Sequence, residues 1–317
     1  MTKPRIVIYA SSLFAWPCIE KLQQTGQLVG VITPDPSQYQ QGKEALLLLL
    51  NTLATNNIAF EAVCKEKLHL IPSHLSHFTA DLALVMGFRY RLPSSVLSHY
   101  PRGIINCHAS KLPEYAGRDP IYWQIRNQET HSALTWHHMS EQLDSGQVVL
   151  QEPVMISAED TYASLTQRFA YLALHSLDAL LNELGSSQQQ HVNSVSALAL
   201  PPPHIDLDFS QFGAGQIDAL TRASNGHFGR VLCKAKGMHI EVIQATAVDY
   251  PNYGVAPGTV VMISQEHGLV VSSQNGCVRL DILACELGVL SGERLAHLIH
   301  LDAGERLNNS EFLQQQA

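Results

Sequence analysis

Short hydrophobic runs alternate with amphipathic stretches over roughly the first 185 residues. Runs of this length, rich in Val, Ile and Leu, are typical of strands, and the amphipathic stretches between them have helical spacing. Short apolar strands that alternate with helices favour a parallel sheet covered on both faces. We therefore predict an α/β, Rossmann-like domain with a parallel-rich sheet, whose first strands are 5–10, 28–32, 58–63, 82–86 and 103–107.

The pattern changes after a long amphipathic helix that ends near Gly185. The next segment is polar and contains Gln188 to Gln190 and then Pro201 to Pro203, a composition typical of a linker. Beyond it, short alternating strands are separated by Gly and Asn turns, which favours a small β-barrel. We expect a catalytic domain over 1–184, a linker over 185–204 and an OB-like barrel domain over 205–317.

Composition is that of a soluble globular protein with a sizeable core. The chain has 317 residues, of which 45% are hydrophobic and 15% charged, and no apolar run has the ~20 residues that a membrane span needs. The six cysteines are scattered without a Cys-x-x-Cys pair, and residues 1–5 lead directly into a strand without a secretory pattern. We expect a cytoplasmic protein with free thiols.

Three polar residues stand out as candidate catalytic groups: Asn106, His108 and Asp144. Asn106 and His108 are two apart on a predicted strand and so face the same way, whereas Cys107 should face the opposite side as a buried hydrophobe. Amide and imidazole N–H groups can stabilise an oxyanion, and a histidine can move protons near neutral pH. Asp144, in an Asp-Ser-Gly loop, should raise the pKa of His108 and assist proton transfer.

The surrounding residues make this pattern specific. The strand continues as Asn106-x-His108-x-Ser110-x-Leu112-Pro113 and is followed by Gly117, Pro120 and Asp144-x-Gly146. The arrangement resembles the formyltransferase family, which takes a formyl group from 10-formyltetrahydrofolate. Similar segments extend over nearly the whole chain, from Phe14-Ala15 to Ala256-Pro257-Gly258. The resemblance implies a Rossmann-type domain joined by a linker to an OB-like domain.

The same resemblance implies where the folate donor and the amine acceptor bind. The donor would lie between the loop after the strand that ends at Met86 and the loop over 141–144. The residues implied for donor binding are Met86, Gly87, Phe88, Arg89, Tyr90, Leu92 and Leu143, although core packing is an alternative for some of them. The acceptor-side residues are Ser11, Ser110, Tyr115, Arg118 and Trp123.

A metal site is not expected. His131, His137 and His138 are close in sequence, but neighbouring residues on a strand face opposite ways and therefore do not share one ion. The usual ligand spacings are missing from the sequence.

Charge decides the expectation for the acceptor. Family members that act on methionyl-tRNA carry basic residues beyond the Leu-Pro, where this chain has Glu114 and Ala116. The formal net charge is −8, and residues 205–317 contain seven Lys or Arg against twelve Asp or Glu. A surface that follows phosphates should be basic. One small basic cluster remains: Arg222, Arg230, Lys234 and Lys236.

We therefore expect transfer to the primary amine of a small or carrier-tethered acceptor, such as an amino-sugar nucleotide or an amino acid, with tRNA possible but disfavoured. Three alternatives remain open: a methionyl-tRNA formyltransferase with a reduced basic surface, a formyltetrahydrofolate hydrolase that uses water as acceptor, and a non-catalytic folate-binding protein. The presence of Asn106, His108 and Asp144 argues against the last of these.

Overall fold

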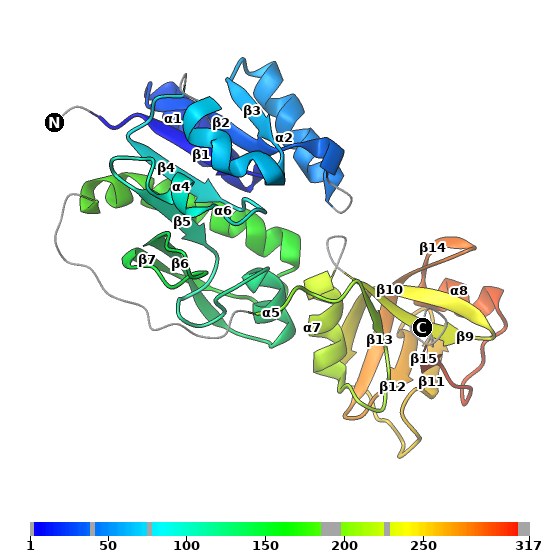
Figure 1. Cartoon of the computed structure of the whole chain (residues 1–317). Coiled ribbons are helices and arrows are strands. Elements are labelled where there is room, and N and C mark those ends of the chain that lie inside the picture. Colours follow the sequence, from blue (N-terminus) through cyan, green and yellow to red (C-terminus); the bar gives the residue numbers. More distant parts are fainter. Residues whose placement is uncertain (1–2, 39–41, 75–77, 185–197, 225–228, 310–317) are drawn as a thin grey trace. The chain divides into compact units, whose positions relative to one another are not determined.

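The computed structural model describes residues 3–38, 42–74, 78–184, 198–224 and 229–309 (Figure 1). Contacts divide the chain into two compact units, described separately below. The first comprises Met1–Pro120, His131–Met155 and Ser164–Ala199, and the second comprises Ile121–Thr130, Ile156–Ala163 and Leu200–Ala317. The second unit thus takes two short segments that precede residue 184, and most of the expected linker, 185–197, lies outside the described residues.

The first unit is built on a seven-stranded sheet in the order β3-β2-β1-β4-β5-β6-β7. The pairings among β1 to β5 are parallel, whereas β6 pairs antiparallel with β5 and β7. This confirms the predicted α/β class with a parallel-rich sheet. The strands are β1 (Ile6–Ala10), β2 (Leu28–Pro34), β3 (Phe60–Val63), β4 (Leu82–Met86), β5 (Ile104–His108), β6 (His131–His138) and β7 (Val148–Met155).

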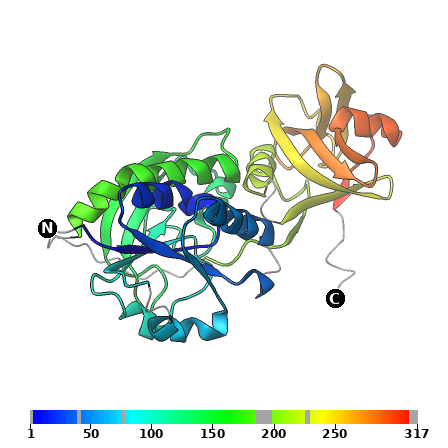
Figure 2. The ribbon, with the colours of Figure 1, turned by 90° about the horizontal axis from the view of Figure 1, so that it is seen from above.

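Helices cover both faces of this sheet (Figure 2). One layer contains α1 (Trp16–Gln24), α2 (Lys43–Thr55) and α6 (Tyr162–Glu183). The other contains the 3-10 helix η3 (Lys65–Leu70), α3 (Ile71–His74) and α4 (Ser94–Leu97). Ile104 packs in the core with Leu68 of η3 and Val96 of α4, whereas Cys107 lies near Cys18 of α1, which together with burial raises the pKa of the Cys107 thiol. Since strand residues alternate, Asn106 and His108 lie on the face of Ile104.

The strand order places a topological switch point beside β1. β1 lies between β2 and β4, so the loops that leave β1 and β4 are neighbours although they are far apart in sequence. The Arg89 N–H after β4 donates a hydrogen bond of 3.1 Å to the Ser11 hydroxyl after β1. In open α/β sheets, ligands bind beyond the carboxyl ends of the strands at such a point.

The second unit is dominated by an eight-stranded sheet whose main path is β11-β12-β13-β10-β9-β15, with β14 on β13 and β8 on β9. Within the described ranges, no helix of either unit is long and apolar enough to cross a membrane. Helix α5 (Pro120–Arg126) belongs to this unit except for Pro120. The other elements are β8 (His204–Asp206), α7 (Ala214–Ser224), β9 (Arg230–Ala235), β10 (Met238–Val248), β11 (Val260–Ser264), β12 (Gly268–Ser272), β13 (Cys277–Cys285), β14 (Gly288–Ser291), α8 (Gly292–Leu298) and β15 (Asn308–Asn309).

A short C-terminal segment closes this sheet into the expected barrel. β15 pairs with β9, and the residues just before it bond to the start of β11. Val260 N–H donates to the Glu305 carbonyl and Leu307 N–H donates to the Gly258 carbonyl, both at 2.8 Å. Closure covers the start of β11 and one edge of β9, which reduces the backbone open to pairing with other chains.

We predict that Gly258→Ala weakens the barrel. Gly258 has φ +86°, and an added Cβ would lie 2.6 Å from the Leu307 carbonyl oxygen of the closing segment. Backbone strain and displacement of that segment should lower the free energy of unfolding of the second unit by about 2 kcal/mol or more. Calorimetric unfolding measures the loss.

The control is Gly254→Ala, which has φ +68° but open space around the added Cβ. It should cost only the backbone term, about 1 kcal/mol. Equal losses in the two variants would show that contact with the closing segment contributes nothing.

Candidate functional site

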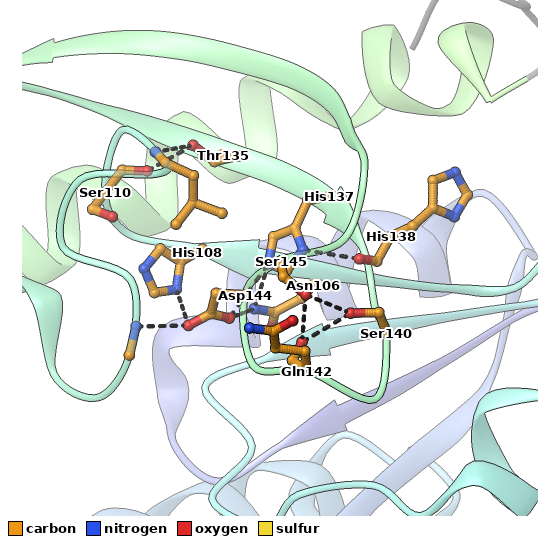
Figure 3. A network of polar contacts seen from close by, with 12 residues as sticks. Asn106, His108, Ser110, Thr135, His137, His138, Ser140, Gln142, Asp144 and Ser145 are labelled. Atoms are coloured by element: carbon orange, nitrogen blue, oxygen red, sulfur yellow. Dashed lines mark hydrogen bonds and ion pairs between the residues drawn. The ribbon is translucent and has the colours of Figure 1, made fainter. Parts of the chain in front are cut away.

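Two neighbouring strands supply most of the candidate site (Figure 3). In the antiparallel pairing of β5 with β6, Asn106 lies opposite His137 and His108 lies opposite Thr135. Directly opposed residues on one face have Cβ atoms within about 5.5 Å, so these side chains meet. His108 and His137 are buried and Asn106 is half-buried.

Asp144 reaches these strands from the loop that joins β6 to β7. Its φ is +49°, a left-handed conformation that Asp tolerates better than most residues. The Ser140 hydroxyl holds the loop by bonding to the Gln142 carbonyl at 2.8 Å and to the Ser145 hydroxyl at 2.9 Å. Gly146 is required here, because a Cβ would lie 1.7 Å from the His138 carbonyl oxygen. The loop therefore passes tightly under β6 and delivers the carboxylate to the site.

The Asp144 carboxylate is buried at the centre of the cluster. Its Oδ2 accepts a hydrogen bond of 2.8 Å from Gly117 N–H and lies 3.6 Å from His108 Nδ1. Its Oδ1 lies 3.4 Å from Asn106 Nδ2 and 3.5 Å from His137 Nε2. The structure thus brings the three predicted catalytic residues together and adds His137 to them (Figure 3).

The turn after β5 fixes the orientation of His108. Its Nε2 lies 3.0 Å from the Tyr115 carbonyl oxygen, which only accepts hydrogen bonds, so Nε2 carries a proton. The turn contains a cis bond between Leu112 and Pro113, and Tyr115 has φ +56°. Because Nε2 keeps its proton in the hydrogen bond to Tyr115, Nδ1 is the ring nitrogen that can gain or lose a proton, and it faces Asp144.

Two side chains from β6 and β7 hold this turn in place. Thr135 donates a hydrogen bond of 2.6 Å to the Ser110 carbonyl. Gln151 donates to the Leu112 carbonyl and to the Thr135 hydroxyl, both at 3.0 Å. Since the turn also carries Gly117 and the Tyr115 carbonyl, this clamp sets the geometry of both His108 and Asp144.

Burial controls the electrostatics of the site. Burial lowers the pKa of His108, and the neighbouring His137 lowers it further. Asp144 and the Tyr115 carbonyl raise this pKa, but the resulting pKa is below the usual value for histidine. This reverses the pKa direction expected from the carboxylate alone, because desolvation of a buried imidazolium outweighs one attraction. Burial also raises the pKa of Asp144, but His108, His137 and Gly117 N–H lower it more, so the carboxylate is ionised at neutral pH.

The two loops expected to hold the donor are joined to each other. The Arg91 guanidinium donates to the Glu141 carbonyl, and the Ser94 hydroxyl donates to the Glu141 carboxylate at 2.7 Å. Leu143, beside Asp144, is an apolar side chain that is 45% exposed, as a surface for a flat ligand requires. Of the other expected donor contacts, Phe88 and Tyr90 are half-buried, Gly87 and Arg89 are exposed, and Met86 and Leu92 are buried.

The expected acceptor-side residues occupy different environments, and their contact with an acceptor stays a prediction. Ser11 bonds to Arg89 N–H, and the buried Ser110 hydroxyl donates to the Glu114 carbonyl at 2.7 Å. Tyr115 contributes its carbonyl to His108, and Arg118 is exposed. Trp123 belongs to the second unit, where the Arg126 guanidinium lies 5.1 Å from the centre of its ring.

Metal ligands do not gather anywhere in the part of the chain that the structure describes. No group of three or more His, Cys, Asp or Glu residues there could hold an ion. Cys107 is buried, and burial raises the pKa of its thiol well above the usual value. It is therefore no thiolate nucleophile at neutral pH.

Sequence reasoning assigned no role to His137, Thr135, Gln151 or Gly117. The sequence offers His137 as a candidate metal ligand and, in Thr135-x-His137-x-Met139, as part of a segment similar to the formyltransferase family, and it alternates with Thr135 on a predicted strand. That alternation placed the two side chains on one face, but the register of β6 against β5, which brings them to Asn106 and His108, is not visible in the sequence.

Two family models and two curated relatives, each of a formyltransferase, match this chain. The family models "Formyl transferase" and "Formyl transferase, C-terminal domain" match residues 5–179 and 205–288. The chain is 31% identical to a methionyl-tRNA formyltransferase of Acidithiobacillus ferrooxidans, over 96% of this chain and 99% of that one. It is 29% identical to the same kind of enzyme from Alkaliphilus oremlandii, over 86% of this chain and 89% of that one.

A solved structure shows the same fold. The N-formyltransferase of Helicobacter canadensis, in complex with folinic acid and dTDP-3-aminofucose, aligns with a TM-score of 0.61. The alignment covers 86% of this chain and 97% of that one, at 16% sequence identity.

We predict that Asp144→Asn lowers the pKa of His108 further. The carboxylate is one of the two influences that raise this pKa, so removing its charge leaves burial less opposed. NMR titration of the His108 ring measures the change, with the resonance assigned by its loss in His108→Ala. Asp178→Asn, which changes an exposed carboxylate on α6, is the control and should leave the His108 pKa unchanged. A higher His108 pKa in Asp144→Asn would contradict the electrostatic account.

Proposed function

The chain belongs to the formyltransferase family, and from that premise we propose that it formylates the primary amine of a small or carrier-tethered acceptor. As a member of this family it is an enzyme whose formyl donor is 10-formyltetrahydrofolate. The finer assignment concerns the acceptor: an amino-sugar nucleotide or an amino acid. The observation that carries this assignment is that Arg and Lys side chains of the second unit form ion pairs with its own Asp and Glu side chains.

The Asn106, His108 and Asp144 cluster supports direct transfer without a covalent enzyme intermediate. Attack of the amine on the formyl carbon gives a tetrahedral carbon that bears an oxyanion, which Asn106 can stabilise with an amide N–H. The lowered pKa leaves His108 neutral near pH 7, ready to accept the amine's proton at Nδ1. The imidazolium so formed faces the ionised Asp144 at 3.6 Å, which stabilises it until the proton passes to the folate nitrogen that leaves.

Three of the four cations in the basic cluster of the second unit pair with acids of the same unit. Arg222 pairs with Asp218 at 2.6 Å and Arg230 pairs with Glu241 at 2.7 Å. Lys236 pairs with Glu305 at 2.5 Å. Cations that already have a partner release few counterions from a phosphate backbone, and that release supplies most non-specific affinity for nucleic acids. The paired charges therefore favour an acceptor whose binding does not require contact with the phosphates of a tRNA.

In its described part, the loop after β2 also presents polar and acidic groups rather than unpaired cations. Ser37 N–H bonds to the Asp35 carboxylate at 2.8 Å, and the Gln38 amide donates to Glu66 at 2.8 Å. The Lys65 N–H bonds to Gln38 Oε1 at 3.1 Å, so the loop is tied down by polar and acidic groups. Residues 39–41 of this loop and Asn225 to Phe228 lie outside the described residues.

Methionyl-tRNA is the second candidate acceptor. The curated relatives named above are methionyl-tRNA formyltransferases that align over most of the chain, and this likeness gives no support for disfavouring tRNA. The sugar-nucleotide ligand of the Helicobacter canadensis enzyme favours the first candidate instead. The family chemistry is common to both, so the choice depends on the surface that meets the acceptor.

We predict that the protein formylates an amino-sugar nucleotide or a free or tethered amino acid faster than it formylates charged initiator methionyl-tRNA. The assay follows consumption of 10-formyltetrahydrofolate with each acceptor in turn, with a known tRNA formyltransferase as reference. Affinity for the tRNA should be weak and should change little with salt, because few cations are available to phosphates. A rate on methionyl-tRNA comparable to the reference would overturn the assignment, and formate release without any amine would identify a hydrolase.

We also predict that Asp144→Asn lowers turnover by about a hundredfold or more while the fold is retained, the range for acid–base and oxyanion groups. The variant keeps the shape of the side chain but loses the charge that stabilises the protonated His108. Turnover is measured at saturating donor, and circular dichroism checks the fold. Near-normal turnover would remove Asp144 from the mechanism.

A further inference from the structure

Asn106 contributes to formyl transfer only if its amide presents the correct end to the donor. An oxyanion needs the N–H end, but the oxygen and nitrogen ends of an amide have nearly the same shape. Something beside Asn106 must therefore select the orientation. Its nearest described partner is His137 Nε2, 3.1 Å from Asn106 Nδ2.

His137 is held in the protonation form that makes this selection. Its Nδ1 lies 2.9 Å from the His138 carbonyl oxygen, which only accepts hydrogen bonds, so Nδ1 carries a proton. In the neutral ring Nε2 then offers a lone pair. The His138 carbonyl is itself fixed, because His138 N–H bonds to the Gln147 carbonyl at 2.8 Å and Gly146 packs against it. A lone pair at Nε2 attracts the NH2 end of Asn106 and repels its oxygen.

The positions of the two acceptors beside Asn106 allow one of its N–H groups to remain for the substrate. Asn106 Nδ2, His137 Nε2 and Asp144 Oδ1 form a nearly equilateral triangle with sides of 3.1, 3.4 and 3.5 Å. The two acceptors therefore subtend about 60° at the amide nitrogen, whereas the two hydrogens of a planar NH2 group are about 120° apart. One hydrogen directed between the two acceptors can serve both, and the other then points away from them.

We infer that His137 is a positioning residue: together with Asp144 it holds one N–H of Asn106, and so directs the second N–H toward the formyl oxygen. The inference rests on the role proposed for Asn106 and deepens it. His137 touches neither donor nor acceptor in this account. It acts through the amide, from the strand position directly opposite (Figure 3).

The test compares two substitutions at residue 137 with a matched change on the same strand. His137→Leu removes the acceptor, His137→Gln can restore one through its side-chain oxygen, and His131→Leu makes the first change at the exposed start of β6. We expect His137→Leu to lower kcat about 10- to 100-fold while KM for 10-formyltetrahydrofolate changes less than about 3-fold. His137→Gln should recover most of the lost rate, and His131→Leu should match the unmodified protein.

A spectroscopic measurement tests the inference even if no acceptor is turned over. The side-chain NH2 resonances of Asn106, assigned by their loss in Asn106→Asp, should be widely separated, because one hydrogen is bonded and the other is free. The separation should shrink in His137→Leu and persist in His131→Leu. An unchanged separation, or a changed separation with unchanged kcat, would overturn the inference. Failure of the acceptor proposal alone would leave the resonances as expected.

Discussion

The buried carboxylate of Asp144 is the feature on which the arrangement of the site depends. A charge removed from water costs several kcal/mol unless partners replace its hydration. Here the hydrogen-bond donors come from the Asn106 amide on β5 and the Gly117 N–H in the turn after β5, and His108 becomes a further partner once its Nδ1 is protonated. Because one carboxylate needs all of them, a displacement of any element leaves a buried charge less well satisfied. The same contacts that stabilise this corner of the fold therefore keep the chemical groups in register.

The antiparallel position of β6 makes this convergence possible. Its pairing with β5 puts His137 opposite Asn106, so an amide and an imidazole meet across two strands. The alternate residues of the same strands face the helices, where Trp136 donates a hydrogen bond of 2.8 Å to Ser176 of α6. One strand pair thus contributes to the hydrophobic core on one face and to the site on the other. Core packing and site geometry are linked through a single register.

The two units differ in how their charged side chains are arranged. In the first unit a negative charge is concentrated and buried among histidines, where desolvation holds the pKa of His108 below its usual value. In the second unit opposite charges pair locally, as Arg230 does with Glu241. One relative is a methionyl-tRNA formyltransferase, whereas the solved N-formyltransferase of the same fold holds dTDP-3-aminofucose. In the proposed function the buried cluster performs the transfer, and the surface charge of the second unit influences which amine is accepted.

The sequence by itself determined the α/β class, the second barrel-forming region and the meeting of Asn106, His108 and Asp144. Strand and helix periodicity are local properties, and the motif around Asn106 is specific enough to be recognised. Only the tertiary structure decided the register that adds His137, the closure of the barrel by residues 305–309 and the direction of the His108 pKa shift. Each of these depends on groups distant in sequence: register on pairing between strands, closure on a segment too short to have a periodicity, and the pKa on how completely the packed chain excludes water.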